Sequence, residues 1–258
     1  MFPTLVFTTG VVLPLSLARA IYAITLQSPK VVLVIGASSG IDLQVTRLYA
    51  AMSDTTIITA SSNLGKLRQS IQRLDPTPTK LECQQLDLRR RPNKIAERVK
   101  ELDRTYGPIT HLHTVSSISN HLESQKPWEL EVTDDMINVS IIGTVATVLT
   151  IYKAIKERQQ GGKICIVGSV AGFSSPANMI SYASTKAFIN TFAMDLRCIA
   201  AEYNIAVVTV VPGFIKTCMT DRMRSRQSSM PDFEFVSAKG MAKAMMKGVE
   251  QGEVGLVS

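Results

Sequence analysis

The chain lacks the cysteine and aromatic patterns that mark zinc fingers and RNA-recognition modules. None of its four cysteines stands in C-x-x-C spacing, and no segment resembles the aromatic signature of an RNA-binding sheet. Cys83 and Cys165 fall in segments with the pattern of buried strands, which predicts free thiols in a reducing compartment. His111 and His113 would face one side of a strand, but no further ligands accompany them. We therefore expect no metal site.

Acidic residues are the minority among the charged side chains. The chain has 21 Asp and Glu against 28 Lys and Arg, a formal net charge of +7, which suits phosphates, an anionic cofactor or an acidic membrane surface. The basic residues are scattered except for the run Arg89-Arg90-Arg91, which we interpret as a solvated loop face. The sequence thus predicts no nucleic-acid partner.

The first 26 residues contain almost no charge. Residues 2–18 are uncharged, Arg19 follows, and apolar residues resume through Leu26. No positive segment precedes the apolar run, which argues against a cleaved signal peptide. We expect a membrane anchor or a membrane-surface helix at residues 2–26, because Arg19 could reach the interface and let the run span. The alternative is a helix packed on the domain or on a partner subunit.

The basic body that begins at Lys30 places the main domain in the cytosol if the leader is anchored, by the positive-inside rule. The expected localisation is therefore a membrane, such as that of the endoplasmic reticulum, with the main domain facing the cytosol. Without an anchor the cytoplasm is expected. Residues 1–29 are expected to form the leader and residues 30–258 a single domain.

Beyond Pro29, short β-branched apolar runs alternate with longer helical segments. This alternation predicts an α/β fold, a Rossmann-type doubly wound parallel sheet of about seven strands covered by helices on both faces. Strands are expected at 31–35, 55–60, 80–86, 109–115, 163–168, 205–211 and in the terminal VGLV, and helices through about 51 and at 63–74, 93–105, 134–158, 181–203 and 237–250.

A glycine-rich turn follows the first expected strand. The segment 36–42, GASSGID, lets the backbone approach a diphosphate, and the next helix offers unpaired amides to it. Later in the chain, Tyr182 and Lys186 stand one helical turn apart in YASTK. A free phenol has a pKa near ~10, so it needs a nearby ammonium, and about 3–4 kcal/mol of differential interaction, to serve as a base at neutral pH.

Together, VIGASSGI, LDL at 86–88, GSVAG at 168–172, YASTK and VPGFIKT at 211–217 resemble the short-chain dehydrogenase/reductases in order and spacing. The resemblance covers about residues 30–257, and with the leader it looks like the membrane-associated, ketosphinganine-reductase-like branches. It implies an NAD(P)-binding catalytic domain acting on a small-molecule carbonyl or alcohol. It also implies a homodimer, in which the two long helices at 134–158 and 181–203 form a four-helix interface.

The resemblance implies a catalytic group of Ser169, Tyr182, Lys186 and Ser140. Ser169 stands thirteen residues before Tyr182, the family's spacing, and would polarise the substrate carbonyl, while Lys186 would also hold the nicotinamide ribose. Ser140 aligns with the family's relay asparagine, and Asn138 would point elsewhere. The cofactor-binding residues implied are Gly36, Ser38, Ser39, Gly40, Ile41, Ser62, Asp87, Tyr182, Lys186, Pro212, Gly213, Ile215 and Thr217.

No carboxylate follows the second strand, where 60–63 reads ASSN with Lys66 downstream. An acid there would repel a 2′-phosphate, so its absence favours NADP(H), with NAD as the alternative. Segment 214–235 would be a substrate lid whose methionines and phenylalanines suit an apolar substrate.

The sequence departs from the family pattern at several places. Ile35 replaces the threonine before the first glycine, Asp42 replaces the third glycine, and segment 114–117 reads TVSS instead of Asn-Asn-Ala-Gly. These changes keep two alternatives open besides a reductase: a catalytically weak or inactive nucleotide-binding sensor that acts through a partner, and a structural membrane protein without cofactor.

Overall fold

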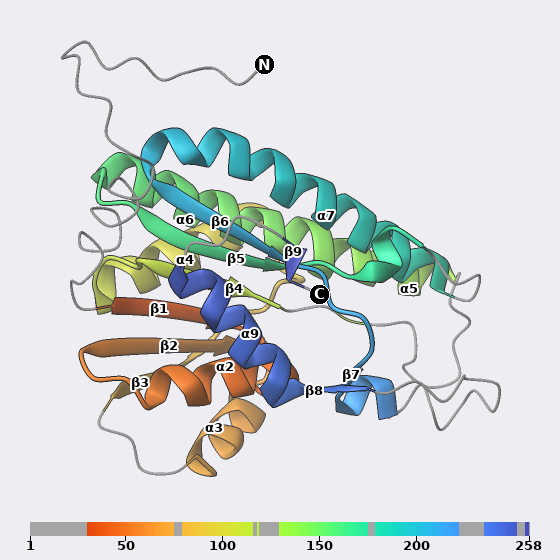
Figure 1. Cartoon of the computed structure of the whole chain (residues 1–258), viewed down its shortest axis with the longest axis horizontal. Coiled ribbons are helices and arrows are strands. Elements are labelled where there is room, and N and C mark those ends of the chain that lie inside the picture. Colours follow the sequence, from red (N-terminus) through yellow and green to blue (C-terminus); the bar gives the residue numbers. More distant parts are fainter. Residues whose placement is uncertain are drawn as a thin grey trace.

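The structure is a computed structural model, and it describes residues 30–74, 79–115, 118, 129–174, 179–221 and 235–251 together with the backbone of 256–257. Seven parallel strands form one sheet in the order β3-β2-β1-β4-β5-β6-β9, as Figure 1 shows. The strands are β1 (Lys30–Ile35), β2 (Thr55–Ser61), β3 (Lys80–Gln85), β4 (His111–Thr114), β5 (Gly162–Val167), β6 (Ile205–Val210) and β9 (Leu256–Val257). The expected doubly wound sheet is confirmed.

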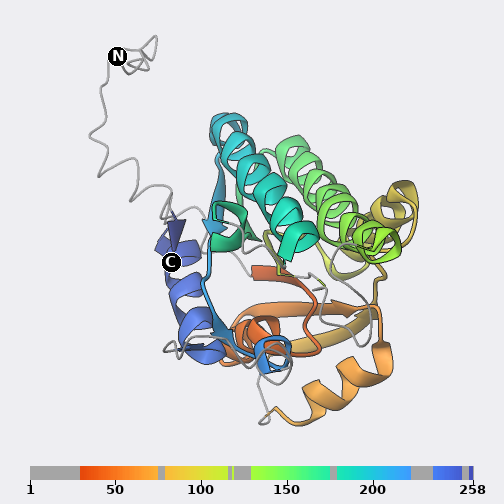
Figure 2. The ribbon, with the colours of Figure 1, turned by 90° about the vertical axis from the view of Figure 1, so that its right-hand side faces the viewer.

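Helices cover both faces of the sheet, because the buried strands carry apolar side chains on both sides. In Figure 2, α4, α6 and α7 lie on one face, and α2 and α9 lie on the other. The helices are α2 (Gly40–Ala50), α3 (Leu64–Gln72), α4 (Pro92–Tyr106), α5 (Leu130–Met136), α6 (Thr144–Arg158), α7 (Ile180–Ala200) and α9 (Ala238–Gln251), and a small second sheet joins β7 (Ile215–Lys216) to β8 (Val236–Ser237).

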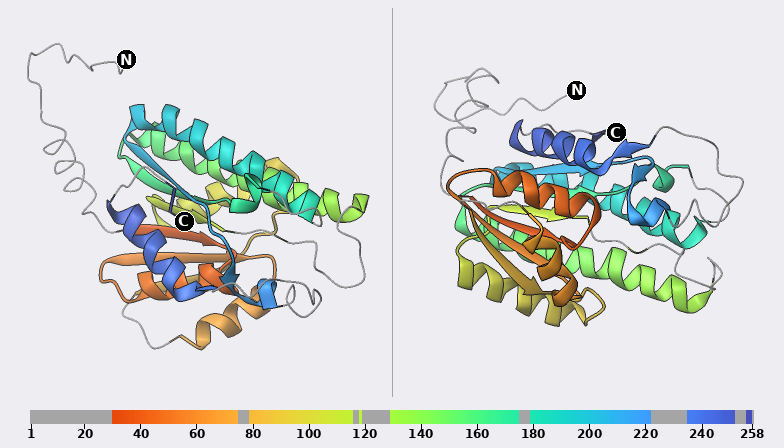
Figure 3. Two further views of the ribbon diagram at one scale, coloured as in Figure 1. Left: turned by 45° about the vertical axis from the view of Figure 1, so that its right-hand side comes forward. Right: turned by 90° about the horizontal axis from the view of Figure 1, so that it is seen from below.

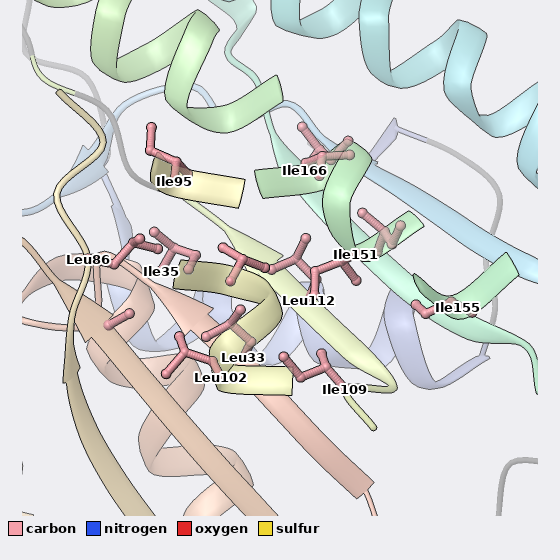
Figure 4. Packing of buried hydrophobic residues seen from close by; sticks show 14 of the residues in the cluster. Leu33, Ile35, Leu86, Ile95, Leu102, Ile109, Leu112, Ile151, Ile155 and Ile166 are labelled. Carbon is pink, nitrogen blue, oxygen red and sulfur yellow. The ribbon is translucent and has the colours of Figure 1, made fainter. Parts of the chain in front are cut away.

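The larger of the two cores fills the space between the sheet and α4, α6 and α7. Figure 4 shows side chains of β1, such as Leu33, meeting Leu102 of α4, while Ile151 of α6 lies beside Leu112 of β4. All four of these side chains are at most 1 % exposed. This packing fixes the strand order, and the strand order in turn decides which turns meet at the sheet's carboxyl edge.

The helix expected at 134–158 differs from the structure in extent and in form. It begins earlier, at Leu130, and its middle turn Ile137–Gly143 (η1) is π-helical. A π turn closes bonds five residues apart, and hydrophobic periodicity does not signal it. Gly143 ends this turn against Leu88, so close that a Cβ at position 143 would meet the Leu88 Cβ at 2.5 Å.

A partly buried polar network joins α9 to the amino ends of the central strands. The Glu250 carboxylate accepts a 2.6 Å hydrogen bond from Lys30 Nζ and lies 3.6 Å from Lys163 Nζ. Tyr49 donates its hydroxyl to the same carboxylate at 3.4 Å. Burial alone would raise the pKa of Glu250, but Lys30 and Lys163 outweigh it and hold that pKa below its usual value. The network therefore fastens the last helix to the sheet.

His113 belongs to the same network and should make the fold sensitive to acid. Its Nε2 lies 3.0 Å from the Tyr49 hydroxyl, and burial lowers the pKa of His113 to about 4. The unfolded chain takes up the proton near pH ~6.5, so this stability is complete above that pH and is lost as the pH falls towards the folded value. We expect about 2 kcal/mol less unfolding free energy at pH ~5 than at pH ~7 from this residue.

Urea unfolding at the two pH values measures this loss. A His113→Gln variant, which cannot titrate, should show a correspondingly smaller pH dependence. Burial also lowers the pKa of His111, so part of the dependence should persist in the variant. Equal pH dependence in both proteins would contradict the assignment to His113.

Candidate active site

One cavity of about 430 Å³ lies at the carboxyl edge of the sheet. Its volume is in the range that small ligands and cofactors occupy. Its lining residues come from the turn after β1, the ends of β2 and β5, the start of α7 and the segment after β6. The left view of Figure 3 shows how the backbone of these segments runs. The topology brings these segments together, because parallel strands end at the same edge.

The turn after β1 forms a cradle for an anion. Gly36 and Gly40 have φ values of 92° and 66°, a conformation that glycine adopts without strain. The N-cap residue of α2 is Ser39, and its side chain makes no capping hydrogen bond, which leaves the first amides of α2 for another partner. Ser38 and Ile41 also line the cavity. This cradle fits a cofactor diphosphate.

The ends of β2 and β3 form the opposite wall. Ser62 and Lys66 line the cavity beyond β2, and Asp87 lines it beyond β3. Asp87 Oδ1 accepts the backbone amide of Arg89 at 3.0 Å. Arg89 also lines the cavity and binds Asp135 through Nε at 3.2 Å. Arg89 is exposed, as expected of a solvated loop face, and it also lines the rim of the cavity, which the sequence did not indicate.

Tyr182 and Lys186 project from the first two turns of α7 into the same cavity. The Lys186 ammonium lies 5.8 Å from the centre of the Tyr182 ring and donates a 2.9 Å hydrogen bond to the carbonyl of Val167 at the end of β5. Burial lowers the pKa of Lys186 to about 8, and the carboxyl of Asp42 opposes that shift. The lysine can therefore lie between charged and neutral forms near physiological pH.

Ser169 follows β5 and lines the cavity beside Tyr182. Its Oγ accepts the amide of Ala171 at 3.2 Å and donates to the carbonyl of Pro212 at 3.5 Å. The second contact is long for a hydroxyl, so the proton can turn to a better acceptor in the cavity. The geometry therefore allows Ser169 to donate to a substrate oxygen.

The loop after β6 closes the remaining side. Pro212, Gly213, Ile215 and Thr217 all line the cavity. The backbone amide of Thr217 donates to Thr220 Oγ1 at 2.9 Å, and that hydroxyl donates to the carbonyl of Ile215 at 2.6 Å. These bonds hold the turn that faces the cradle of Gly40.

Ser140 is the one expected site residue that the structure does not bring to the cavity wall. It lies in the π-helical turn, 2 % exposed, and within the described chain its Oγ has no hydrogen-bond partner. Its neighbour Val139 lines the cavity instead. Asn138 points elsewhere, as expected, and donates to Asp134 at 2.9 Å. A relay role for Ser140 stays a prediction.

Asn190 is a site residue that the sequence did not reveal. Its Oδ1 accepts the amide of Ser169 at 3.3 Å, and its Nδ2 donates to the Ser169 carbonyl at 3.0 Å. It lies on α7 one turn beyond Lys186, so Tyr182, Lys186 and Asn190 share one helix face. The sequence signal that could have revealed Asn190 is its place four residues after Lys186, on the helix face that also carries Tyr182.

Asn190→Ala should loosen Ser169. The change leaves the buried amide of Ser169 unpaired and removes one of the two donors to its carbonyl, which keeps the amide of Gly172 at 3.0 Å. The loss costs about 2 kcal/mol of stability. We expect turnover to fall about tenfold while cofactor affinity stays unchanged, because a misplaced hydroxyl costs transition-state stabilisation. Urea unfolding and steady-state kinetics measure the two effects. Asn204→Ala, a change outside the cavity, is the control for general destabilisation, and equal turnover loss in both variants would contradict the role.

Several expectations fall on residues that the structure does not describe. The leader 2–26 lies outside the described residues, as do 116–117 of the TVSS segment and most of the expected lid, 222–234. Within the described part, one helical stretch, Leu130–Arg158, is long and apolar enough to cross a membrane, and it packs on the domain core. It therefore gives no support to membrane association.

All four cysteines are free thiols, in agreement with the sequence, and the described residues hold no metal-binding group.

Comparison with known proteins extends these findings. A family model described as short chain dehydrogenase matches residues 30–228. The 3-oxoacyl-(acyl-carrier-protein) reductase FabG of Thermotoga maritima is 30 % identical over 208 residues, which cover 78 % of this chain and 81 % of that protein. Carbonyl reductase family member 4 of Xenopus laevis is 28 % identical over 195 residues, 76 % of this chain and 79 % of that protein.

Solved structures share the fold at low identity. A short-chain dehydrogenase from Sphingobium yanoikuyae in complex with NADPH superimposes with a TM-score of 0.75 at 22 % identity and covers 88 % of this chain and 87 % of its own. An actinorhodin polyketide ketoreductase variant with NADPH also gives a TM-score of 0.75, at 20 % identity, over 86 % of this chain and 90 % of its own.

Proposed function

Since this chain belongs to the short-chain dehydrogenase/reductase family and is thus an NAD(P)-dependent oxidoreductase, we propose that it interconverts a ketone or aldehyde and its alcohol on an apolar small molecule, with NADP(H) as the hydride carrier. The observation that carries the proposal is the meeting of Ser169, Tyr182 and Lys186 in one cavity with the glycine cradle of Gly36 and Gly40.

The chemistry divides between the cofactor and the chain. A nicotinamide cofactor held by the cradle and by the loop after β6 would supply or accept the hydride. In the reduction, the Tyr182 hydroxyl donates its proton to the former carbonyl oxygen, and in the oxidation the phenolate takes that proton back. Ser169 Oγ holds the same oxygen and stabilises the charge that develops on it. Lys186 stabilises the phenolate through its ammonium, whose position the carbonyl of Val167 fixes.

The preference for NADP(H) rests on the charges beyond β2. Ser62 and Lys66 line the cavity there, Arg89 lines it from the next turn, and no carboxylate stands at the end of β2. Two cations and a hydroxyl favour a 2′-phosphate, which a carboxylate would repel. The NADPH complexes of the two structural neighbours support the same preference.

An apolar substrate is supported by side chains exposed around the start of α7. Leu130, Phe173 and Ile180 are 82 %, 59 % and 53 % exposed. Thr133 on α5 lies within hydrogen-bond distance of Ser181 on α7, 2.7 Å between the hydroxyl oxygens, so the two helix starts are neighbours. Large apolar side chains exposed beside a catalytic cavity indicate a surface for apolar ligands.

A homodimer and an N-terminal leader complete the proposal. Ile142 on η1, Leu149 on α6, and Phe188 and Ile199 on α7 are exposed, and these helices would pair with their copies. Sedimentation velocity measures the oligomeric state.

The division into a leader at 1–29 and a domain at 30–258 agrees with a family match that begins at residue 30. Comparing membrane and soluble fractions with and without residues 1–26 tests the leader.

Isothermal titration of the protein with NADPH and NADH, followed by a panel of apolar ketones and aldehydes, tests the function. We expect NADPH to bind more tightly than NADH, and NADPH to be consumed with at least one ketone. Failure of both nucleotides to bind would refute the proposal. Binding without any turnover would favour a second candidate, a nucleotide-binding sensor, which the replacement of a glycine by Asp42 and the buried Ser140 favour.

A further inference from the structure

Asp42 places a carboxyl group in the wall of the cofactor cavity. It lies in the first turn of α2, directly after the cradle of Gly40, at the position where the family pattern has its third glycine. The residue is 6 % exposed, and it lines the cavity. Among the described residues its Oδ1 has no hydrogen-bond partner. The hydrogen bond that acts on the carboxyl comes from the residue's own backbone amide, so a buried charge there is only partly compensated and is favoured by a nearby cation.

Lys186 supplies that compensation across the cavity wall. It is 3 % exposed, lines the same cavity, and its ammonium is the cation that acts on the Asp42 carboxyl. The two groups do not form a direct ion pair, because the ammonium is held by the carbonyl of Val167 at 2.9 Å. They therefore interact through space, in a buried environment that screens charge weakly.

The pair is coupled in both directions. Burial raises the pKa of Asp42 well above its usual value, and Lys186 opposes this. Burial lowers the pKa of Lys186 to about 8, and Asp42 opposes this. Each charge thus favours the charged form of the other.

The other groups near the pair do not replace Asp42. Cys165 on β5 faces Asp42, but burial raises the pKa of its thiol, so it stays neutral. Tyr182 precedes Lys186 on α7 and carries the reacting proton. Lys66, Asp87 and Arg89 also line the cavity, from the ends of β2 and β3. Asp42 is therefore the carboxylate that acts on Lys186.

We propose that Asp42 is a positioning residue of the reaction. Its carboxylate keeps the Lys186 ammonium charged, and Lys186 can assist Tyr182 only up to the pH at which that charge is lost. The role rests on the proposed function, because it concerns the same lysine. A glycine at this position would leave Lys186 with no counter-charge in a buried wall. The Asp42 carboxylate thus counteracts the lowering of the Lys186 pKa that burial causes.

The test is a titration of Lys186 in the cofactor-free protein. NMR of protein labelled with ¹³C at the lysine ε-carbon reports the charge of each lysine, and the Lys186 signal is assigned by its absence in Lys186→Met. We expect Asp42→Asn, which preserves shape and removes charge, to lower the Lys186 midpoint by about one pH unit. Asp42→Gly, the residue of the family pattern, should lower it similarly. Asp87→Asn removes a carboxylate from the same cavity and should leave the midpoint unchanged.

An unchanged midpoint in Asp42→Asn, or an equal fall in Asp87→Asn, would overturn the proposal. Should the asparagine variant not fold, the glycine variant gives the same reading. In the holoenzyme, the alkaline limb of the pH profile of kcat/KM should move to lower pH in Asp42→Asn, which a merely structural role would not produce. Because the NMR titration needs no cofactor, it remains decisive even if NADPH fails to bind and the proposed function is refuted.

Discussion

Tyr182→Phe should lower carbonyl turnover about 10³-fold and leave NADPH affinity unchanged. The variant keeps the aromatic ring, and Lys186 keeps its hydrogen bond to the carbonyl of Val167, so the cavity wall is preserved. Only the hydroxyl that carries the proton is lost, and positioned acid–base groups contribute about 10²- to 10⁴-fold to rates. Steady-state kinetics with the best ketone of the panel and isothermal titration with NADPH measure the two quantities.

Tyr152→Phe is the matched control, because it removes the same hydroxyl from a residue of α6 that is not part of the cavity lining. Its turnover should remain within about twofold of the wild type, because the ring keeps its packing and only a hydroxyl away from the cavity is lost. Residual activity of Tyr182→Phe equal to that of the control would show that another group donates the proton. The role assigned to Tyr182 would then be wrong.

Ser62→Asp should reverse the cofactor preference. A carboxylate beyond the end of β2 would repel the 2′-phosphate of NADPH and accept the ribose hydroxyl of NADH. We expect NADPH to bind about 100-fold more weakly, which corresponds to about 2.7 kcal/mol, and NADH to bind equally or more tightly. Isothermal titration with both nucleotides measures the change at constant ionic strength, because the repulsion is screened by salt.

Ser53→Asp is the control for the added charge. Ser53 precedes β2 at the opposite end of the same strand, is exposed, and does not line the cavity. The affinity of the Ser53→Asp variant for NADPH should differ from that of the wild type by no more than about twofold. A parallel loss of NADPH and NADH affinity in Ser62→Asp would mean that the residue supports the turn rather than the phosphate. The preference for NADP(H) would then need another origin.

Local sequence patterns were sufficient for the strands of the main sheet and for most helices, and together with the family resemblance they gave most of the site. The run at 31–35 is apolar on both faces, which is the pattern of a buried parallel strand, and it became β1. Two motifs of the site each span only a few consecutive residues and can therefore be recognised in the sequence. They are the turn with Gly36 and Gly40 and the pair of Tyr182 and Lys186. The expected positions in the turn after β1 and in the loop after β6 all line the cavity.

Contacts between distant segments could not be predicted in this way. Asn190 clamps the backbone of Ser169, which is 21 residues away, and Glu250 binds Lys30 across 220 residues. No local period links such pairs, because the sheet order and the helix packing bring them together. The π-helical turn that buries Ser140 likewise depends on the packing around Gly143 and not on propensity.

The sequence by itself determined the doubly wound sheet, through the alternation of apolar strands with helices, and the glycine cradle and the serine, tyrosine and lysine of the site, through motifs in the order and spacing of the family. Only the tertiary structure decided what surrounds them. It set Asp42 in the cavity wall within electrostatic reach of Lys186, turned Arg89 to the cavity, and left Ser140 outside its lining. The physical reason is that burial and charge compensation depend on which elements pack together, and that packing is a property of the whole chain.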